Sequence, residues 1–197
     1  MMIRLSKVTK SYGDNVVFKR LSYKIKDKEI VGITGKSGVG KTTLLRCLSD
    51  LEEIQSGTLE VNTDISYMFQ EDRLCPWLTL YDNVLLPLKL QGKKITESVK
   101  EDIEMFSKMF AVEGELDKKI NEVSGGQRQR ILLIRAMITK PRVLLLDEPF
   151  KSLDDKLYNQ IIPKFLAYCR AKNLTILIAS HNKKVLKRCD KVLNLNI

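Results

Sequence analysis

A glycine-rich segment followed by lysine and threonine has the residue types needed to hold a phosphate group. It reads Gly35-Lys36-Ser37-Gly38-Val39-Gly40-Lys41-Thr42. Glycines allow positive φ angles and a close approach of the backbone, so successive N–H groups can converge on an anion. Lys41 would reach the β- and γ-phosphate oxygens, and the Thr42 hydroxyl would be a Mg²⁺ ligand. The segment therefore predicts a phosphate-binding loop.

The residues on either side of this loop supply the context that the motif needs. An apolar run over residues 30–33 reads as a strand, and residues 43–48, beginning with Thr43, read as a helix. The N-terminus of that helix would add unpaired amides and the positive end of its dipole. A glycine-rich turn capping an ordinary helix is the alternative, but a turn requires only one or two glycines and no lysine here.

Two adjacent carboxylates end a second apolar stretch. After Arg142, residues 143–146 form a continuous apolar run, as expected for a strand of a parallel sheet covered on both faces, and Asp147 and Glu148 follow it. Asp147 is placed to hold Mg²⁺, directly or through water. Glu148 would face an attacking water and polarise it as a general base. A capping Asp with a surface Glu is the less favoured interpretation, since the same chain carries the phosphate-binding loop.

A second pair of glycines precedes another apolar helix. The residues are Ser124-Gly125-Gly126-Gln127. A serine hydroxyl, exposed backbone amides and a helix N-terminus together could form a second anion cradle. The same residues are equally typical of a well-capped helix, and composition alone does not choose between the two.

Three single residues are candidates by position. Gln70 and His181 follow the strands expected at residues 64–69 and 174–179, at the end where α/β sheets hold ligands. Tyr12, in a turn expected at residues 10–14, could stack on an adenine face. Each of the three is also compatible with a structural role.

The pattern of the elements predicts an α/β fold with two additions. Alternating residues 3–8 and 16–25 indicate antiparallel strands before the loop, and helical periodicity covers residues 81–90 and 96–110. We therefore expect one domain over residues 1–197. Residues 1–70 and 140–197 would form the α/β core with its β subdomain, and residues 71–139 an inserted helical subdomain.

Composition favours a globular protein that stays in the cytoplasm. The 197 residues are 44% hydrophobic, with no apolar run of the ~18 residues that cross a bilayer and no signal peptide. Four widely spaced cysteines and one histidine suggest neither a disulfide framework nor a zinc site. The net charge of +10 is compatible with nucleic acid, an anionic membrane surface or a nucleotide site, but its scattered residues favour a solvated basic surface.

Taken together, the motifs resemble those of the ATP-binding subunits of ABC (ATP-binding cassette) transporters, over essentially the whole chain and in the family's order. Residues 35–42 match Walker A, residues 124–127 the signature and residues 143–147 Walker B. The single-residue matches are Tyr12 as the adenine-stacking aromatic, Gln70 of the Q-loop, Glu148 as catalytic glutamate, Asp154 of the D-loop and His181 as the switch histidine.

The resemblance implies a P-loop NTPase fold with a RecA-like parallel-sheet core, an N-terminal antiparallel β subdomain and an inserted helical subdomain. It implies ATP and Mg²⁺ as cofactors and hydrolysis of ATP. Catalysis would use Lys41, Gln70, Glu148 and His181, and the metal would be held by Thr42, Gln70 and Asp147. The nucleotide would contact Tyr12, Gly35, Lys36, Ser37, Gly38, Val39, Gly40, Lys41, Thr42, Thr43, Ser124, Gly125, Gly126, Gln127 and Asp154.

In this family two cassettes dimerise head to tail, so that each ATP lies between one phosphate-binding loop and the partner's signature. Membrane subunits dock near the Q-loop, which places our candidate docking surface at residues 71–80, from Glu71 through Trp77 to Leu80. The protein would lie at the cytoplasmic face of the cell membrane, as a homodimer or heterodimer, with or without an external solute-binding protein. No nucleic acid is expected.

Residues 70–79 are similar to importers of the nitrate, sulfonate and taurine group, which suggests import of a small anion. The chain departs from the family where Val123 replaces the usual leucine and where Asn182-Lys183-Lys184 replaces acidic residues. We also expect no regulatory C-terminal domain.

Alternatives are the energising subunit of an exporter, or a cassette protein acting on nucleic acid or ribosomes. The latter resemble cassettes with long coiled coils or two cassettes per chain, which this sequence lacks. A P-loop kinase or GTPase would leave the signature residues and Glu148 without a use.

Overall fold

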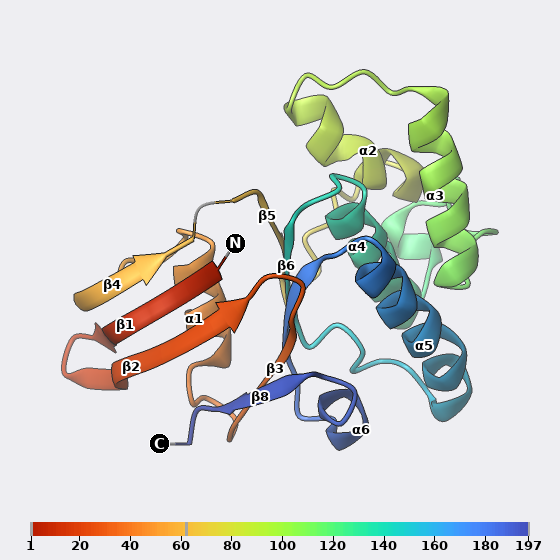
Figure 1. Ribbon diagram of the computed structural model, residues 1–197. Coiled ribbons are helices and arrows are strands. Elements are labelled where there is room, and N and C mark those ends of the chain that lie inside the picture. The colour runs from red at the N-terminus through yellow and green to blue at the C-terminus, as the bar shows by residue number, and fades with distance from the viewer. Residues whose placement is uncertain (1, 62, 197) are drawn as a thin grey trace.

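Two β-sheets and a group of helices make up the part of the chain that the computed structural model describes, residues 2–61 and 63–196. The expected domain limits Met1 and Ile197 lie outside these residues. Figure 1 shows the antiparallel sheet at one side, the parallel sheet in the centre and most of the helices at the other side. The central sheet is therefore covered on both faces.

The antiparallel sheet contains β1 (Met2–Tyr12), β2 (Asn15–Lys26) and β4 (Ser56–Glu60), in the order β2-β1-β4. The turn expected over residues 10–14 is wrong in extent, because Lys10, Ser11 and Tyr12 pair with β2 and only Gly13 and Asp14 form the turn. A strand extends as long as its partner offers backbone groups to pair with, and local turn residues do not reveal this.

A glycine also lies inside a strand of this sheet, since β4 begins at Ser56 and includes Gly57. Gly57 has φ +95°, and a Cβ there would lie 2.4 Å from the carbonyl oxygen of Lys7. Glycine is needed here for a close approach of two strands, which produces the same sequence signal as a turn.

The five-stranded sheet has every neighbouring pair parallel and the order β5-β6-β7-β3-β8. Its strands are β3 (Ile30–Thr34), β5 (Ile65–Met68), β6 (Val143–Asp147), β7 (Thr175–Ala179) and β8 (Lys191–Asn194). All five residues of β6 and of β7 are buried. The expected α/β fold with a parallel sheet and an antiparallel addition is confirmed.

Six α-helices and one short 3-10 helix connect these strands in the described residues. They are α1 (Lys41–Leu48), α2 (Leu80–Leu90), α3 (Glu97–Met109), η1 (Ile120–Glu122), α4 (Gly125–Met137), α5 (Asp155–Ala171) and α6 (Lys183–Leu186). No helix in the described part of the chain is long and apolar enough to cross a membrane.

Two hydrophobic clusters lie on the two faces of the parallel sheet. Leu144 and Leu146 of β6 pack with α2 to α5, while Val143 and Leu145 pack with α1 and the antiparallel sheet. This alternation follows from the two-residue period of a strand. Because α2, α3 and α4 share one cluster with the sheet, the limits of the helical subdomain at residues 71 and 139 stay a prediction.

We expect Phe165→Ala to lower the free energy of unfolding by roughly 3–5 kcal/mol, since it empties a fully buried aromatic position. Phe165 is 0% exposed, and its ring centroid lies 5.6 Å from that of Phe150 and 6.0 Å from that of Phe110. Urea unfolding followed by circular dichroism measures the change. Met105→Ala, at a position 37% exposed on α3, is the control and should cost about 1 kcal/mol or less. Equal losses for the two variants would contradict this account of the core.

Candidate active site

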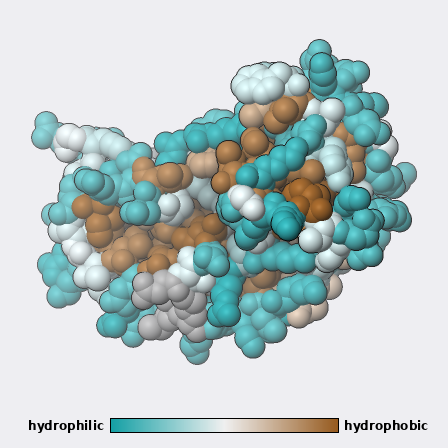
Figure 2. Space-filling view, turned by 90° about the horizontal axis from the view of Figure 1, so that it is seen from above, coloured by the Kyte–Doolittle hydropathy of each residue, from teal (hydrophilic) through white to brown (hydrophobic). Residues whose placement is uncertain are grey.

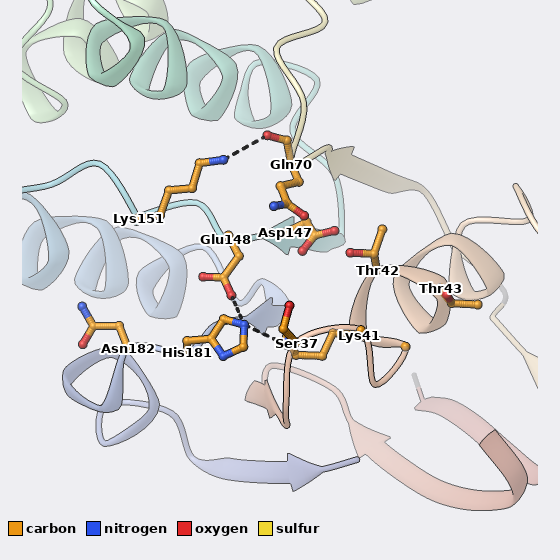
Figure 3. Close-up of a pocket in the computed structure, with 12 residues that line it drawn as sticks. Ser37, Lys41, Thr42, Thr43, Gln70, Asp147, Glu148, Lys151, His181 and Asn182 are labelled. Carbon is orange, nitrogen blue, oxygen red and sulfur yellow. Dashed lines mark hydrogen bonds and ion pairs between the residues drawn. The ribbon is translucent and has the colours of Figure 1, made fainter. Parts of the chain in front are cut away.

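A cavity of about 590 Å³ lies at the carboxyl ends of the parallel strands. The loops after β3, β5, β6 and β7 meet there, as expected for a ligand site in an open parallel sheet. Figure 3 shows the side chains pointing into it from these loops and from α1. The lining residues are Ser37, Gly38, Gly40, Lys41, Thr42, Thr43, Gln70, Asp147, Glu148, Lys151, His181 and Asn182.

The phosphate-binding loop is shaped by glycines at positive φ angles, which other residue types rarely adopt. Gly40 has φ +105°, and a Cβ there would lie 2.3 Å from Cγ1 of Val17. Gly38 has φ +77° with open space around it, so its requirement is conformational only. No side chain caps the N-terminus of α1. The amides of its first turn are therefore available to an anion.

Lys41 bridges the loop and the end of β7. Its side chain is buried, and Nζ lies 3.1 Å from the carbonyl oxygen of Gly35 and 3.3 Å from that of Lys36. A third contact joins Nζ to Nε2 of His181 at 3.1 Å. Because an ammonium group only donates, Nε2 of His181 accepts in this contact. Lys41 and His181, separated by most of the sequence, thus meet as expected.

Asp147 fits a Mg²⁺ ligand. Its side chain is 1% exposed, with Oδ2 3.4 Å from the hydroxyl of Tyr67. Burial raises the pKa of Asp147, and a hydrogen bond from the Thr42 hydroxyl opposes that rise. Figure 3 shows Thr42 and Gln70 directed toward the same carboxylate. Oxygen donors are what Mg²⁺ prefers, and it also keeps positions for water and phosphate.

Glu148 has a backbone conformation that is unusual for its residue type. Its φ angle is +49°, its N–H donates to the carbonyl of Ala179 at 3.0 Å, and Oε1 lies 3.5 Å from Nε2 of His181. Burial raises the pKa of Glu148, while the nearby His181 and Lys41 lower it by a smaller amount. Oε1 is buried and has no hydrogen-bond partner among the described residues. A carboxylate with an unpaired oxygen in a cleft suits a proton acceptor.

Lys151 and Asn182 also line the cavity, although sequence reasoning did not select them as site residues. Nζ of Lys151 donates to the backbone carbonyl of Gln70 at 3.5 Å. Lys151 lies three residues after Glu148, in the turn that leads to Asp154. This closeness in sequence to Glu148 could have identified Lys151 as a site residue. Asn182 caps α6 through its side chain.

The signature residues form a capped helix start apart from this cavity. Oγ of Ser124 accepts from N–H of Gln127 at 3.2 Å, and the Gln127 side chain accepts from N–H of Ser124 at 2.8 Å. Gly125 instead lines a smaller pocket of about 190 Å³, together with Gln70 and Lys151. Anion binding at this helix start stays a prediction.

Two other candidates lie outside the cavity lining. Asp154 caps α5, with its carboxylate accepting from N–H of Leu157 at 2.8 Å. Tyr12 is 46% exposed at the end of β1, with Nζ of Lys10 4.4 Å from its ring centre. An exposed ring face is compatible with stacking, and the assignment of Tyr12 to an adenine stays a prediction.

Gln129 is a buried polar residue that sequence reasoning missed. Its side-chain Nε2 donates to the backbone carbonyl of Glu148 at 2.7 Å. The available signal was its helical spacing, because Gln129 precedes the buried Leu133 by four residues and so lies on the core face of α4.

Comparison with known proteins gives one consistent family. A model of the family described as ABC transporter matches residues 18–151. A spermidine/putrescine import ATP-binding protein of Spiroplasma citri is 35% identical, covering 99% of this chain and 59% of its own length. A methionine import ATP-binding protein of Clostridium tetani is 32% identical, over 97% of this chain and 65% of its own length. The chain thus spans about three fifths of the length of these relatives.

Solved structures agree in fold. The dimeric structure of MJ0796, a bacterial ABC transporter cassette, has a TM-score of 0.89 and 27% identity, covering 98% of this chain and 93% of that chain. A dimeric post-hydrolysis state of the same cassette, bound to ADP and Pi, has a TM-score of 0.88 and 26% identity over the same shares.

We expect Glu148→Gln to raise the free energy of unfolding at pH 7 by on the order of 1 kcal/mol, because it removes a buried charge. The pKa of Glu148 is raised in the folded state, so its ionised form opposes folding above that pKa and has no such effect below the unfolded value. The gain should therefore shrink as the pH falls from 7 toward 4.5, the ordinary value. Urea unfolding across this range tests the sign. Glu113→Gln, on an exposed residue, should change little at any pH; a pH-independent gain for Glu148→Gln would contradict the electrostatic account.

Proposed function

The chain belongs to the ABC transporter family, and on this premise we propose that it binds and hydrolyses ATP to drive an importer. The observation that carries the proposal is the convergence of Lys41, Asp147, Glu148 and His181 in one cavity beside the uncapped start of α1. The carboxyl ends of three strands, β3, β6 and β7, supply these groups, so the arrangement depends on the order of these strands in the parallel sheet.

The position of each residue in the cavity assigns it a role in ATP binding or hydrolysis. The amides at the start of α1 and the Lys41 ammonium bind the phosphates of ATP. Asp147, Thr42 and Gln70 would hold Mg²⁺, which supplies neutralisation of the phosphate charge. Glu148 accepts the proton of the attacking water. Its raised pKa makes the carboxylate a stronger base than an ordinary glutamate. His181, in contact with both Lys41 and Glu148, fixes the position of the water and phosphate.

We propose that the active form is a head-to-tail dimer in which Ser124, Gly125, Gly126 and Gln127 face the partner's nucleotide. Apart from Gly125, which lines the neighbouring small pocket, these residues line neither of the two pockets around Gln70 and Lys151. A second chain would bring a second helix start to each ATP, and the amides of both would share the triphosphate charge. Asp154 and Tyr12 would complete the nucleotide contacts.

The docking surface for membrane subunits is proposed at residues 71–80. Trp77 is 73% exposed, and Figure 2 shows hydrophobic patches on one otherwise hydrophilic face of the molecule. The segment is held to the domain rather than free, because Asn83 exchanges two hydrogen bonds with the backbone of Cys75. It is also tied to α4 by an ion pair between Arg128 and Asp72 at 3.2 Å and by donation from Arg135 to the carbonyl of Arg73.

The protein would accordingly work at the cytoplasmic face of the membrane, with the solute chosen by its partners. The similarity of residues 70–79 to the nitrate, sulfonate and taurine group supports a small anion. The relatives' own solutes are more varied, since their names include spermidine/putrescine and methionine importers. Import of a small solute is the shared element, and we propose that function.

Glu148→Gln is expected to form an ATP-dependent dimer, because it keeps the nucleotide contacts while removing the group that activates water. Size-exclusion chromatography with light scattering, with and without Mg-ATP, measures the mass. Adding Ser124→Arg to this variant should return it to a monomer, since the bulky cation blocks the signature surface. A Glu148→Gln protein that hydrolyses ATP at the wild-type rate and never dimerises would refute the scheme.

Trp77→Ala should leave the ATPase activity of the isolated protein within about twofold and abolish its recovery with membrane subunits, because a large exposed aromatic is a typical interface anchor. Affinity purification from native membranes, followed by identification of bound chains, gives the readout. Val16→Ala, at a position 53% exposed on the antiparallel sheet, is the matched control and should bind normally. Unchanged recovery with Trp77→Ala would move the docking site elsewhere, and recovery of RNA or ribosomes would favour a different partner class.

A further inference from the structure

We propose that Gln129 is a positioning residue for Glu148 and sets the direction of its carboxylate in the cavity. The inference rests on the proposed function, in which Glu148 activates water. It goes further by assigning a residue outside the cavity lining to the same reaction.

The contact is short and shielded from water. Gln129 is 6% exposed, and its Nε2 lies 2.7 Å from the backbone carbonyl oxygen of Glu148. A carbonyl oxygen only accepts, so the amide NH₂ of Gln129 must be the group that faces it. The bond joins residues 19 apart in sequence, on α4 and at the end of β6. It therefore fixes tertiary structure.

The backbone of Glu148 needs such a hold. Its φ angle of +49° is rarely adopted by a residue with a long side chain, and the following Pro149 favours an extended conformation instead. Residues persist in such conformations when their surroundings over-determine them. The N–H of Glu148 is held by the carbonyl of Ala179, and its C=O is held by Gln129. A weaker contact from N–H of Lys151, at 3.4 Å, is the other one to this carbonyl.

The carboxylate is held by one backbone hydrogen bond, from His181. Oε1 has no hydrogen-bond partner among the described residues and lies 3.5 Å from Nε2 of His181. The direction of the carboxylate therefore depends on the backbone angles that Gln129 and Ala179 maintain, together with the contact to the backbone of His181. Removing the Gln129 donor would free the peptide between Glu148 and Pro149 and misdirect the base.

Gln129 lies in the second turn of α4, the helix that Ser124 caps. In the proposed dimer this helix start contacts the partner's nucleotide. One hydrogen bond therefore joins the helix that contacts one ATP to the base that acts on the other.

The test uses Gln129→Met, which keeps the length of the side chain and removes the donor. We expect kcat for Mg-ATP to fall about tenfold or more, with KM changed by less than about twofold, because the base is misdirected while the phosphate contacts remain. Binding of a fluorescent ATP analogue should match that of the wild type, and the melting temperature should fall by no more than about 4 °C, as expected for the loss of one buried hydrogen bond. Gln129→Glu, which sets a carboxylate against the carbonyl, should lose at least as much activity. Gln160→Met, on an exposed residue of α5, is the matched control and should retain full activity.

A second comparison separates positioning from a general structural effect. In a Glu148→Gln background, Gln129→Met should cause no further loss in the residual single-turnover rate, since both changes act on one group. Losses that multiply, or a kcat loss accompanied by weaker analogue binding or by a fall in melting temperature of more than about 4 °C, would overturn the proposal. If the wild type hydrolyses ATP and Gln129→Met is equally fast, this inference alone fails. A wild type without ATPase activity would overturn the proposed function as well.

Discussion

Burial of two carboxylates at the end of β6 is the constraint on which the rest of the site depends. Asp147 is the last residue of a strand with no exposed residue and Glu148 follows it, and burial raises the pKa of both. Such groups are unfavourable unless cations and donors surround them. The Lys41 ammonium, after β3, lowers the pKa of both carboxylates, and the backbone of His181, after β7, hydrogen-bonds to Glu148. The strand order that flanks β6 with β5 and β7, and β7 with β3, is what brings these groups together.

The phosphate-binding loop carries positive charge instead. Lys41 donates to the carbonyls of Gly35 and Lys36, which keeps the ammonium group hydrogen-bonded. A triphosphate would exchange these neutral acceptors for charged ones, which form stronger hydrogen bonds. The loop is thus stable before ATP arrives and gains from its arrival.

Much of the fold and site could be predicted because the informative residues lie in short runs next to one another. Glycines before Lys41, and an apolar strand before Asp147, are local patterns with few physical interpretations. The missed features depend on distant partners instead. Lys10 to Tyr12 form a strand because β2 pairs with them, and Gly57 permits an approach to Lys7. Gln129 matters only through the carbonyl of Glu148, a contact that no window of sequence contains.

The two arginine contacts between α4 and the segment around Trp77 have a mechanical consequence. Arg128 and Arg135 lie two turns apart on one helix. The first forms an ion pair with Asp72, and the second donates a hydrogen bond to the carbonyl of the next residue, Arg73. Attachment at two points resists rotation about either one. A force applied at Trp77 would therefore be transmitted to α4 as a rigid body. Ser124, which caps the N-terminus of that helix, would move with it.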